Sequence, residues 1–181
     1  FYSMFPNEGE IVEPTLIRHI ENSFGAAMDY EGQKKQVLKP EQAFLMTTLL
    51  QNVVNNGTGR NAKIQGIQIA GKTGTTNNNI DAWFCGYTPD IEAIIWYGND
   101  DNSPMKKIEG GGRTAAPVFK KFMEEYIKQY PTLRRVFEQP EGVYKGYYDG
   151  GDEFYTNDSP LPQMTPLNEI IQDQENEGLI F

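Results

Sequence analysis

The sequence predicts an α+β fold in which an antiparallel sheet is flanked by helices. Three short segments with strand-like apolar content, residues 67–75, 82–87 and 92–97, follow one another with only brief turns between them. Such short connections favour antiparallel neighbours, because a parallel pair needs a long crossover. Apolar residues also recur at helical spacing on both sides of these segments, over residues 40–55 and 115–128. We therefore expect three adjacent strands with two helices packed against them.

The helix predicted over residues 40–55 has clear start and stop signals. Pro40 suits the first helical turn, where its missing N–H would have no helical partner. The run Asn55-Asn56-Gly57 ends the helix, because glycine tolerates the left-handed conformation of a cap. The apolar positions that recur at helical spacing are Phe44, Met46, Leu49, Leu50, Val53 and Val54.

The last predicted helix, residues 115–128, follows a loop rich in Asn, Asp and Gly. Thr114 is its expected N-cap, since a threonine hydroxyl can accept a hydrogen bond from the first turn. One face of this helix carries Phe119, Phe122, Met123, Tyr126 and Ile127. Near the start of the chain, an extended segment over residues 9–20 is expected to pair with a strand near residues 26–30.

The net charge of −9 belongs to the C-terminal tail. Residues 1–137 contain 15 acidic and 15 basic residues, whereas residues 138–181 contain 10 acidic residues and one lysine. We therefore predict two parts, a folded part over residues 1–137 and an acidic Gly/Pro-rich tail over residues 138–181. Beyond about Ser159 the composition predicts a linker or disorder. Two alternatives stay open for the aromatic residues of the tail: they belong to the linker, or they dock on the folded part.

Composition also excludes several functions. A neutral folded part offers no basic patch for nucleic acid, and no apolar run is long enough to cross a membrane. The opening Phe1-Tyr2-Ser3-Met4-Phe5 has no charged n-region of a signal peptide, so we expect that it continues a longer polypeptide. The single cysteine, Cys85, excludes an internal disulfide and is expected to be a small buried hydrophobe.

The chemical centre of the sequence is Gly71-Lys72-Thr73-Gly74-Thr75, where two motifs overlap. Residues 66–73 match the phosphate-binding pattern G-x-x-x-x-G-K-S/T. That motif needs a flexible loop at the variable positions and a helix directly after the Lys-Thr pair. Here the variable positions alternate like a strand, and Asn-rich turn residues follow. The context therefore disfavours a phosphate loop.

The second interpretation is a Lys-Thr-Gly motif on an edge strand, as in penicillin-binding proteins and class A β-lactamases. A cation attracts the carboxylate of a peptide C-terminus or of a β-lactam, and hydroxyl groups donate hydrogen bonds to it. Gly74 removes a side chain, so a substrate can lie against the strand and pair with its backbone.

The surrounding sequence resembles class A penicillin-binding proteins over residues 1–128. The similar stretches are residues 5–14, 38–59, 70–77, 81–89 and 110–117. In that family, the domain cross-links stem peptides through an acyl-enzyme serine, and an upstream glycosyltransferase domain polymerises glycan. The resemblance implies part of a penicillin-binding, serine β-lactamase-like transpeptidase domain, and a peptidoglycan D,D-transpeptidase within a bifunctional cell-wall synthase. It also implies a place on the extracytoplasmic (periplasmic) face of the inner membrane, anchored by an upstream helix.

The resemblance assigns roles to four residues. Lys72 would supply positive charge and assist proton transfer, and the backbone N–H of Thr75 would form half of an oxyanion hole. Thr73, Gly74 and Thr75 would bind the substrate or a β-lactam. The implied partners are stem peptides ending in D-Ala-D-Ala, β-lactam antibiotics and the upstream segment of the same polypeptide, with no metal and no cofactor. Trp83 and Trp96 are expected to pack within the sheet rather than stack on substrate.

The sequence departs from the family in its nucleophile. The family carries Ser-x-x-Lys and Ser-x-Asn upstream of Lys-Thr-Gly, and no Ser-x-Asn occurs here. The one Ser-x-x-Lys, residues 103–106, follows Lys72 and lies in a polar loop, where no helix would hold the lysine against Ser103. We therefore expect the nucleophile, with two further strands, upstream of Phe1, and no activity from this chain alone. Two alternatives stay open: a non-catalytic periplasmic binding module of the same fold, and a nucleotide-binding protein.

Overall fold

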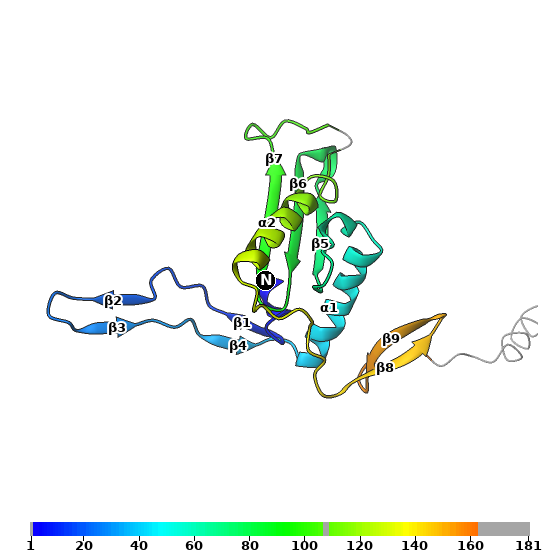
Figure 1. The fold of residues 1–181 in the computed structure, drawn as a ribbon, viewed down its shortest axis with the longest axis horizontal. Helices are drawn as coiled ribbons and strands as arrows, with labels where there is room; N and C mark the ends of the chain where they lie inside the picture. The colour runs from blue at the N-terminus through cyan, green and yellow to red at the C-terminus, as the bar shows by residue number, and fades with distance from the viewer. Residues whose placement is uncertain (1, 107–108, 163–181) are drawn as a thin grey trace, which may run out of the picture. The chain divides into compact units, whose positions relative to one another are not determined.

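The computed structural model describes residues 2–106 and 109–162. They belong to two compact units, residues 1–141 and residues from 142 onward. The elements of the first unit (Figure 1) are η1 (Tyr2–Met4), β1 (Glu10–Val12), β2 (His19–Glu21), β3 (Ala27–Asp29), β4 (Lys34–Gln36), α1 (Pro40–Asn55), η2 (Arg60–Ala62), β5 (Ala70–Thr75), η3 (Asn77–Asn79), β6 (Asp81–Tyr87), β7 (Glu92–Gly98) and α2 (Ala115–Gln129). The second unit holds β8 (Val143–Tyr148) and β9 (Gly151–Thr156).

The centre of the first unit is an antiparallel sheet in the order β5-β6-β7. Its register pairs Lys72 with Cys85, and Cys85 with Ile94. The predicted three-stranded meander is thus confirmed, although the first strand begins at Ala70 rather than at residue 67. Within the described residues β5 is an edge strand, which leaves one side of its backbone unpaired with any strand.

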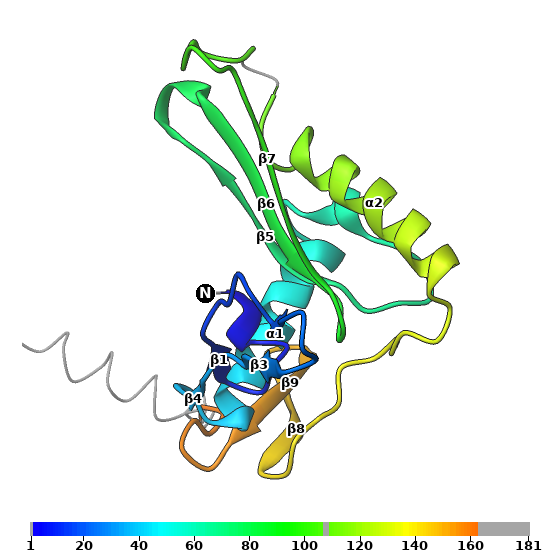
Figure 2. The ribbon, with the colours of Figure 1, turned by 90° about the vertical axis from the view of Figure 1, so that its left-hand side faces the viewer.

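The main core lies between the sheet and α2, which runs along one face of the strands (Figure 2). Phe84 of β6 and Phe119 of α2 are both fully buried, and their ring centroids lie 4.9 Å apart in an edge-on contact. The remaining members of this cluster are Val54, Ala62, Ile67, Ile69, Ala115, Ala116 and Met123. The small residues at the start of α2 let the helix approach the strands closely.

Helix α1 begins where the sequence predicts, and the side chain of Gln42 accepts a hydrogen bond from the Lys39 N–H at its start. Its buried face differs from the predicted one. The fully or nearly buried positions are spaced three or four residues apart: Ala43, Thr47, Leu50 and Val54. Met46 and Leu49 are 39% and 61% exposed, because the helix turns its Ala43–Val54 face, and not these residues, toward β5.

A second cluster joins α1 to the first residue of β5, Ala70. Leu50 packs against Ala70 and Tyr87, together with the partly buried rings of Tyr2, Phe5 and Phe137. The Tyr87 hydroxyl lies 3.0 Å from that of Thr47, which in turn donates to the Ala43 carbonyl. Burial raises the pKa of Tyr87 well above its ordinary value, so this hydroxyl stays protonated.

Helix α2 matches its predicted range but not its predicted details. Only Phe119 and Met123 of the predicted apolar face are fully buried, while Phe122 is 44% exposed. Phe122 instead faces outward beside Tyr126, whose ring also contacts Tyr130. Thr114 does not cap the helix through its side chain, because its hydroxyl donates to the Gly110 carbonyl.

An arm of two antiparallel ribbons precedes α1 and extends away from the sheet (Figure 1). Strand β1 pairs with β4, and β2 pairs with β3 in a register that places Ile20 opposite Met28. The expected pairing of residues 9–20 with residues 26–30 is therefore present at its far end. All residues of β2 and β3 are exposed.

The second unit is a β-hairpin, which the sequence analysis did not expect. Strands β8 and β9 are joined by Asp149 and Gly150, both with positive φ. The rings of Tyr144 and Tyr155 lie 5.5 Å apart across the strands, and Lys145 pairs with Asp152. The predicted lack of regular structure beyond Ser159 concerns mainly residues 163–181, which lie outside the described residues.

Candidate active site

The Lys-Thr-Gly motif lies in the middle of edge strand β5. Strand alternation places Lys72 and Gly74 on one face of the sheet, and Thr73 and Thr75 on the other. The exposed Lys72 side chain donates from Nζ to the carbonyl of Thr73, 2.8 Å away. The strand continues through Thr75 and only the short 3-10 turn η3 comes after it, so the helix that a phosphate loop needs directly after Thr73 is absent here.

The backbone groups of Thr73 and Thr75 point to the open edge of the sheet. The Thr76 N–H donates to the Asp81 carbonyl, so these two residues form a hydrogen-bonded pair. The pairs of Gly74 with Trp83 and of Lys72 with Cys85 are then hydrogen-bonded as well. In an antiparallel ladder these pairs alternate with pairs whose backbone groups point outward. By the register, the outward-pointing positions on β5 include Thr73 and Thr75. An extended peptide can therefore add to this edge as a further strand.

The side chains of Thr73 and Thr75 border an open depression of about 870 Å³. The Thr73 hydroxyl lies 2.7 Å from the hydroxyl of Thr58, and the Gly111 N–H donates to Thr75 Oγ1 over 3.2 Å. The other residues around the depression are Gly57, Arg60, Asn61, Asn79, Glu109, Gly110, Gly112 and Arg113. Threonine hydroxyls, two arginines and one glutamate thus border one space.

Three consecutive glycines hold the loop before α2 against this strand. A Cβ atom on Gly111 would lie 2.7 Å from the carbonyl oxygen of Gly74 and nearer still to that of Trp83, so only glycine fits. The Asn61 side chain donates to the Gly112 carbonyl over 2.7 Å. Residues 110–117 belong to the stretches that resemble the family, whereas no motif in the sequence gives a role to Thr58, Asn61 or Gly111.

The face of the sheet that carries Lys72 is largely open. Trp83 and Trp96 are cross-strand neighbours with ring centroids 6.3 Å apart, and the Trp96 Nε1–H donates to Asp81. The two rings pack on each other as predicted, yet they lie outside the core and are 38% and 45% exposed. Ile94 on the same face is 52% exposed.

Cys85 lies on this face beside Lys72 and is half-buried, so the prediction of a buried cysteine is wrong. The reason is that only the opposite face of β6 is covered by α2. Burial, and then the negative charge of Glu92, raise the pKa of the Cys85 thiol. The thiol is therefore a weak nucleophile near neutral pH.

Ser103 lies in a loop without helical structure, as expected. Its backbone N–H donates to the Asp101 carboxylate, and its carbonyl accepts from the Asn99 side chain. No lysine is held against its hydroxyl by any contact in the described part of the chain. Across residues 2–106 and 109–162, no cluster of three or more acidic, His or Cys side chains could hold a metal ion. None of the helices described there has the length and apolar character that spanning a bilayer requires.

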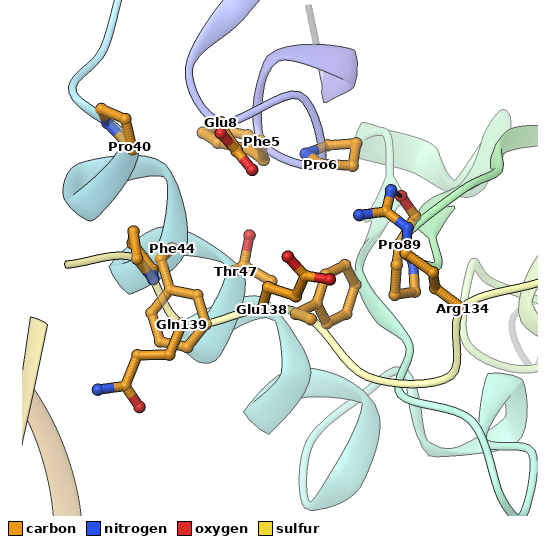
Figure 3. Close-up of a pocket in the computed structure, with 12 residues that line it drawn as sticks. Phe5, Pro6, Glu8, Pro40, Phe44, Thr47, Pro89, Arg134, Glu138 and Gln139 are labelled. Atoms are coloured by element: carbon orange, nitrogen blue, oxygen red, sulfur yellow. Dashed lines mark hydrogen bonds between the residues drawn. The ribbon is translucent and has the colours of Figure 1, made fainter.

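A separate cavity of about 180 Å³ lies at the other end of the sheet (Figure 3). Phe5 and Pro6 close it on one side, and Phe44 and Thr47 of α1 on another. Arg134 also lines it, but its guanidinium is bound to Asp90 at 2.6 Å and to the Pro89 carbonyl. The cavity is thus remote from the threonines of β5 and has its cation already paired.

Comparison with known proteins identifies the family of this chain. The family model of the penicillin binding protein transpeptidase domain matches residues 1–124. Penicillin-binding protein 1A of Neisseria meningitidis serogroup A is 38% identical over 182 residues, which cover 96% of this chain and 22% of that protein. The chain spans 18% to 22% of the length of the first curated relatives that it matches.

Two solved structures share the fold. The crystal structure of penicillin-binding protein 1A from Haemophilus influenzae has a TM-score of 0.75 at 22% identity, over 91% of this chain and 32% of that one. The D,D-transpeptidase domain of a peptidoglycan glycosyltransferase from Eggerthella lenta has a TM-score of 0.58 at 26% identity, over 73% of this chain and 31% of that one. This chain belongs to the penicillin-binding protein transpeptidase family, of whose domain it forms a C-terminal part.

Proposed function

We propose that this chain is the carboxylate-binding half of a peptidoglycan D,D-transpeptidase, whose acylated serine lies upstream in the same polypeptide. The observation that carries the proposal is the edge of β5. Outward-pointing backbone groups of Thr73 and Thr75 lie beside two threonine hydroxyls and an open depression. This arrangement suits a peptide that ends in a carboxylate, such as D-Ala-D-Ala, and a β-lactam that imitates it.

Each motif residue has a role in this proposal. The Thr73 and Thr75 hydroxyls bind the terminal carboxylate, and the absence of a side chain on Gly74 leaves space along the strand. The outward N–H of Thr75 donates to the oxyanion that develops during acylation, where loss of one donor raises the barrier by about 3 kcal/mol. Lys72 places a positive charge near the attacking serine and assists its proton transfer.

The segment that contributes the serine packs on the open face of the sheet. That face presents Lys72 together with exposed apolar side chains of Trp83, Ile94 and Trp96. Exposed apolar side chains that gather on one face commonly mark a contact site. A segment that covers it brings its serine next to Lys72.

The wider protein, by the same proposal, is a bifunctional cell-wall synthase with a glycosyltransferase domain upstream. It acts on the extracytoplasmic face of the cytoplasmic membrane, held there by an upstream transmembrane helix. Loss of this activity would reduce the number of cross-linked stem peptides in the cell wall, which muropeptide analysis measures.

Intact-protein mass spectrometry after exposure to penicillin tests the catalytic assignment. The isolated chain should form no adduct, whereas the full-length protein should gain one penicillin on an upstream serine. Lys72→Ala should slow this acylation strongly, while Ser103→Ala serves as the matched control and should leave it unchanged. An adduct mapped to Ser103 would refute the assignment. A full-length protein that binds stem peptides without acylation would instead favour the non-catalytic binding module.

A further inference from the structure

We infer that Thr58 is a positioning residue that directs the Thr73 hydroxyl toward the carboxylate of the ligand. The inference rests on the proposed function. It adds a residue outside the Lys-Thr-Gly motif that makes the site prefer a ligand with a carboxylate. Thr58 lies between α1 and η2, and its Oγ1 is 2.7 Å from Oγ1 of Thr73.

The direction of the hydrogen bond between Gly111 and Thr75 shows how a neighbouring group can orient a threonine hydroxyl. The Gly111 N–H can only donate, so Thr75 Oγ1 is the acceptor of that bond. The hydroxyl proton of Thr75 is then free to be donated elsewhere. A hydroxyl that receives one hydrogen bond is also a stronger donor, since bonded chains polarise one another.

The same logic applied to Thr73 identifies the role of Thr58. When the Thr58 hydroxyl donates to Thr73, both Thr73 and Thr75 have a proton left for the depression that they border. Two donors aimed at one space match an acceptor-only group, which is what a carboxylate is. Arg60 and Arg113 line the same depression together with one carboxylate, Glu109, so two positive charges there face one negative charge.

Thr58 is held firmly enough for this task. The Gly57 and Gly59 N–H groups on either side of it both donate to the Val53 carbonyl, and the Arg60 guanidinium donates to the Gly57 carbonyl. On its other side the Gly112 backbone packs so closely against the Thr58 carbonyl that a Cβ there would overlap it. A hydroxyl positioned on such a loop is preorganised, which is where orientation contributes most.

The experiment measures the second-order rate of acylation by benzylpenicillin in the full-length protein that contains this chain. Thr58→Val should lower the rate about fivefold, the size of one ordinary hydrogen bond, because Thr58 is exposed and Thr73 is only half-buried. Thr58→Ser should stay near the wild-type rate, because serine keeps the donor. Thr48→Val is a matched control, since the Thr48 hydroxyl donates within α1, to the Leu45 carbonyl.

Two further arms separate positioning from a general structural effect. In a Thr73→Val background, Thr58→Val should have no additional effect, because its target is gone. With the methyl ester of benzylpenicillin, which lacks the carboxylate, Thr58→Val should also change the rate little. Additive losses, or an equal loss on the ester, would overturn the inference. If the wild-type protein is not acylated at all, the proposed function itself fails, whereas acylation that is insensitive to Thr58→Val refutes only the role of Thr58.

Discussion

The substitution Gly111→Ala probes the contact that joins the glycine loop, Gly110-Gly111-Gly112, to strand β5. The new Cβ would lie 2.7 Å from the Gly74 carbonyl oxygen and nearer still to that of Trp83. Both obstacles are backbone atoms of β5 and β6, so no side-chain rotation can relieve the overlap. Either the loop or the edge of the sheet has to move.

The size of the effect follows from these distances. Ordinary contacts of a Cβ begin at 3.4 Å, so the groups must separate by 0.7 Å at Gly74 and by more at Trp83. Overpacking of this kind destabilises a fold by about 1–3 kcal/mol. A displacement of about 1 Å at an edge that, by the proposal, binds substrate can reduce a rate on the order of 100-fold. The loss of acylation should therefore exceed what lowered stability alone explains.

Urea denaturation and penicillin acylation of the full-length protein measure the two effects. Gly110→Ala is the graded control, because its Cβ would meet only the Thr75 side chain, at 3.2 Å. Its effects on the denaturation midpoint and on the acylation rate should both be smaller. If the Gly111→Ala protein had the denaturation midpoint and the acylation rate of the wild type, the described contact between the loop and β5 would be wrong.

Three other outcomes follow from the structure. Phe119→Ala removes a fully buried ring that packs on Phe84 and should lower the free energy of unfolding by about 3–5 kcal/mol, as urea denaturation would show. Burial alone would raise the pKa of Asp90, but the N–H groups and charge of Arg134 outweigh burial and lower it. This contact therefore stabilises the fold above the ordinary carboxyl pKa, and the contribution is lost as pH falls through the lowered pKa. Asp90→Asn should remove that acid-dependent part of the unfolding curve and cost about 1 kcal/mol at neutral pH, whereas an unchanged pH profile would contradict the assignment. Cys85 should react with an aromatic disulfide reagent near neutral pH more slowly than free cysteine does, and a rate equal to that of free cysteine would count against its raised pKa.

The central elements could be predicted from sequence because their signals are local. Pro40 and the Asn-Gly stop mark α1, and the apolar runs that become β6 and β7 are separated by a short turn at Thr88-Pro89-Asp90. The burial of individual residues depends on tertiary contacts and was predicted less well. Leu49 and Phe122 have helical spacing, yet each points away from the sheet, because close packing requires the small residues Ala43 and Ala115 to face it.

The hairpin of the second unit shows a signal that was present and not used. Asp149-Gly150 joins two segments that contain aromatic residues, and an Asp-Gly pair with both φ values positive is the preferred two-residue hairpin turn. The acidic composition of residues 138–181 predicts a tail, and the Asp-Gly turn within them predicts a hairpin. Composition describes an average over many residues, whereas a turn is fixed by two.

The candidate site likewise has one part that the sequence predicts and another that only the fold reveals. Lys72, Thr73 and Thr75 were found because they are contiguous and belong to a recognised motif. Thr58 and Gly111 lie 15 and 36 residues from their hydrogen-bond partners. Only the folding of α1 and the glycine loop around β5 brings them into contact, and no spacing rule in the sequence encodes those distances.

The tryptophan pair on the open face of the sheet has a practical consequence for optical spectroscopy. The chain contains two tryptophans, and both are half-exposed neighbours on adjacent strands of this face. All tryptophan emission from the chain therefore originates on the open face of the sheet, and its wavelength reports the solvent exposure of that face alone. A segment that covers the face would shift the emission to shorter wavelength, whereas a ligand that occupies only the depression beside Thr73 would leave it unchanged. The fluorescence of the unlabelled protein thus distinguishes assembly of the domain from occupation of its site.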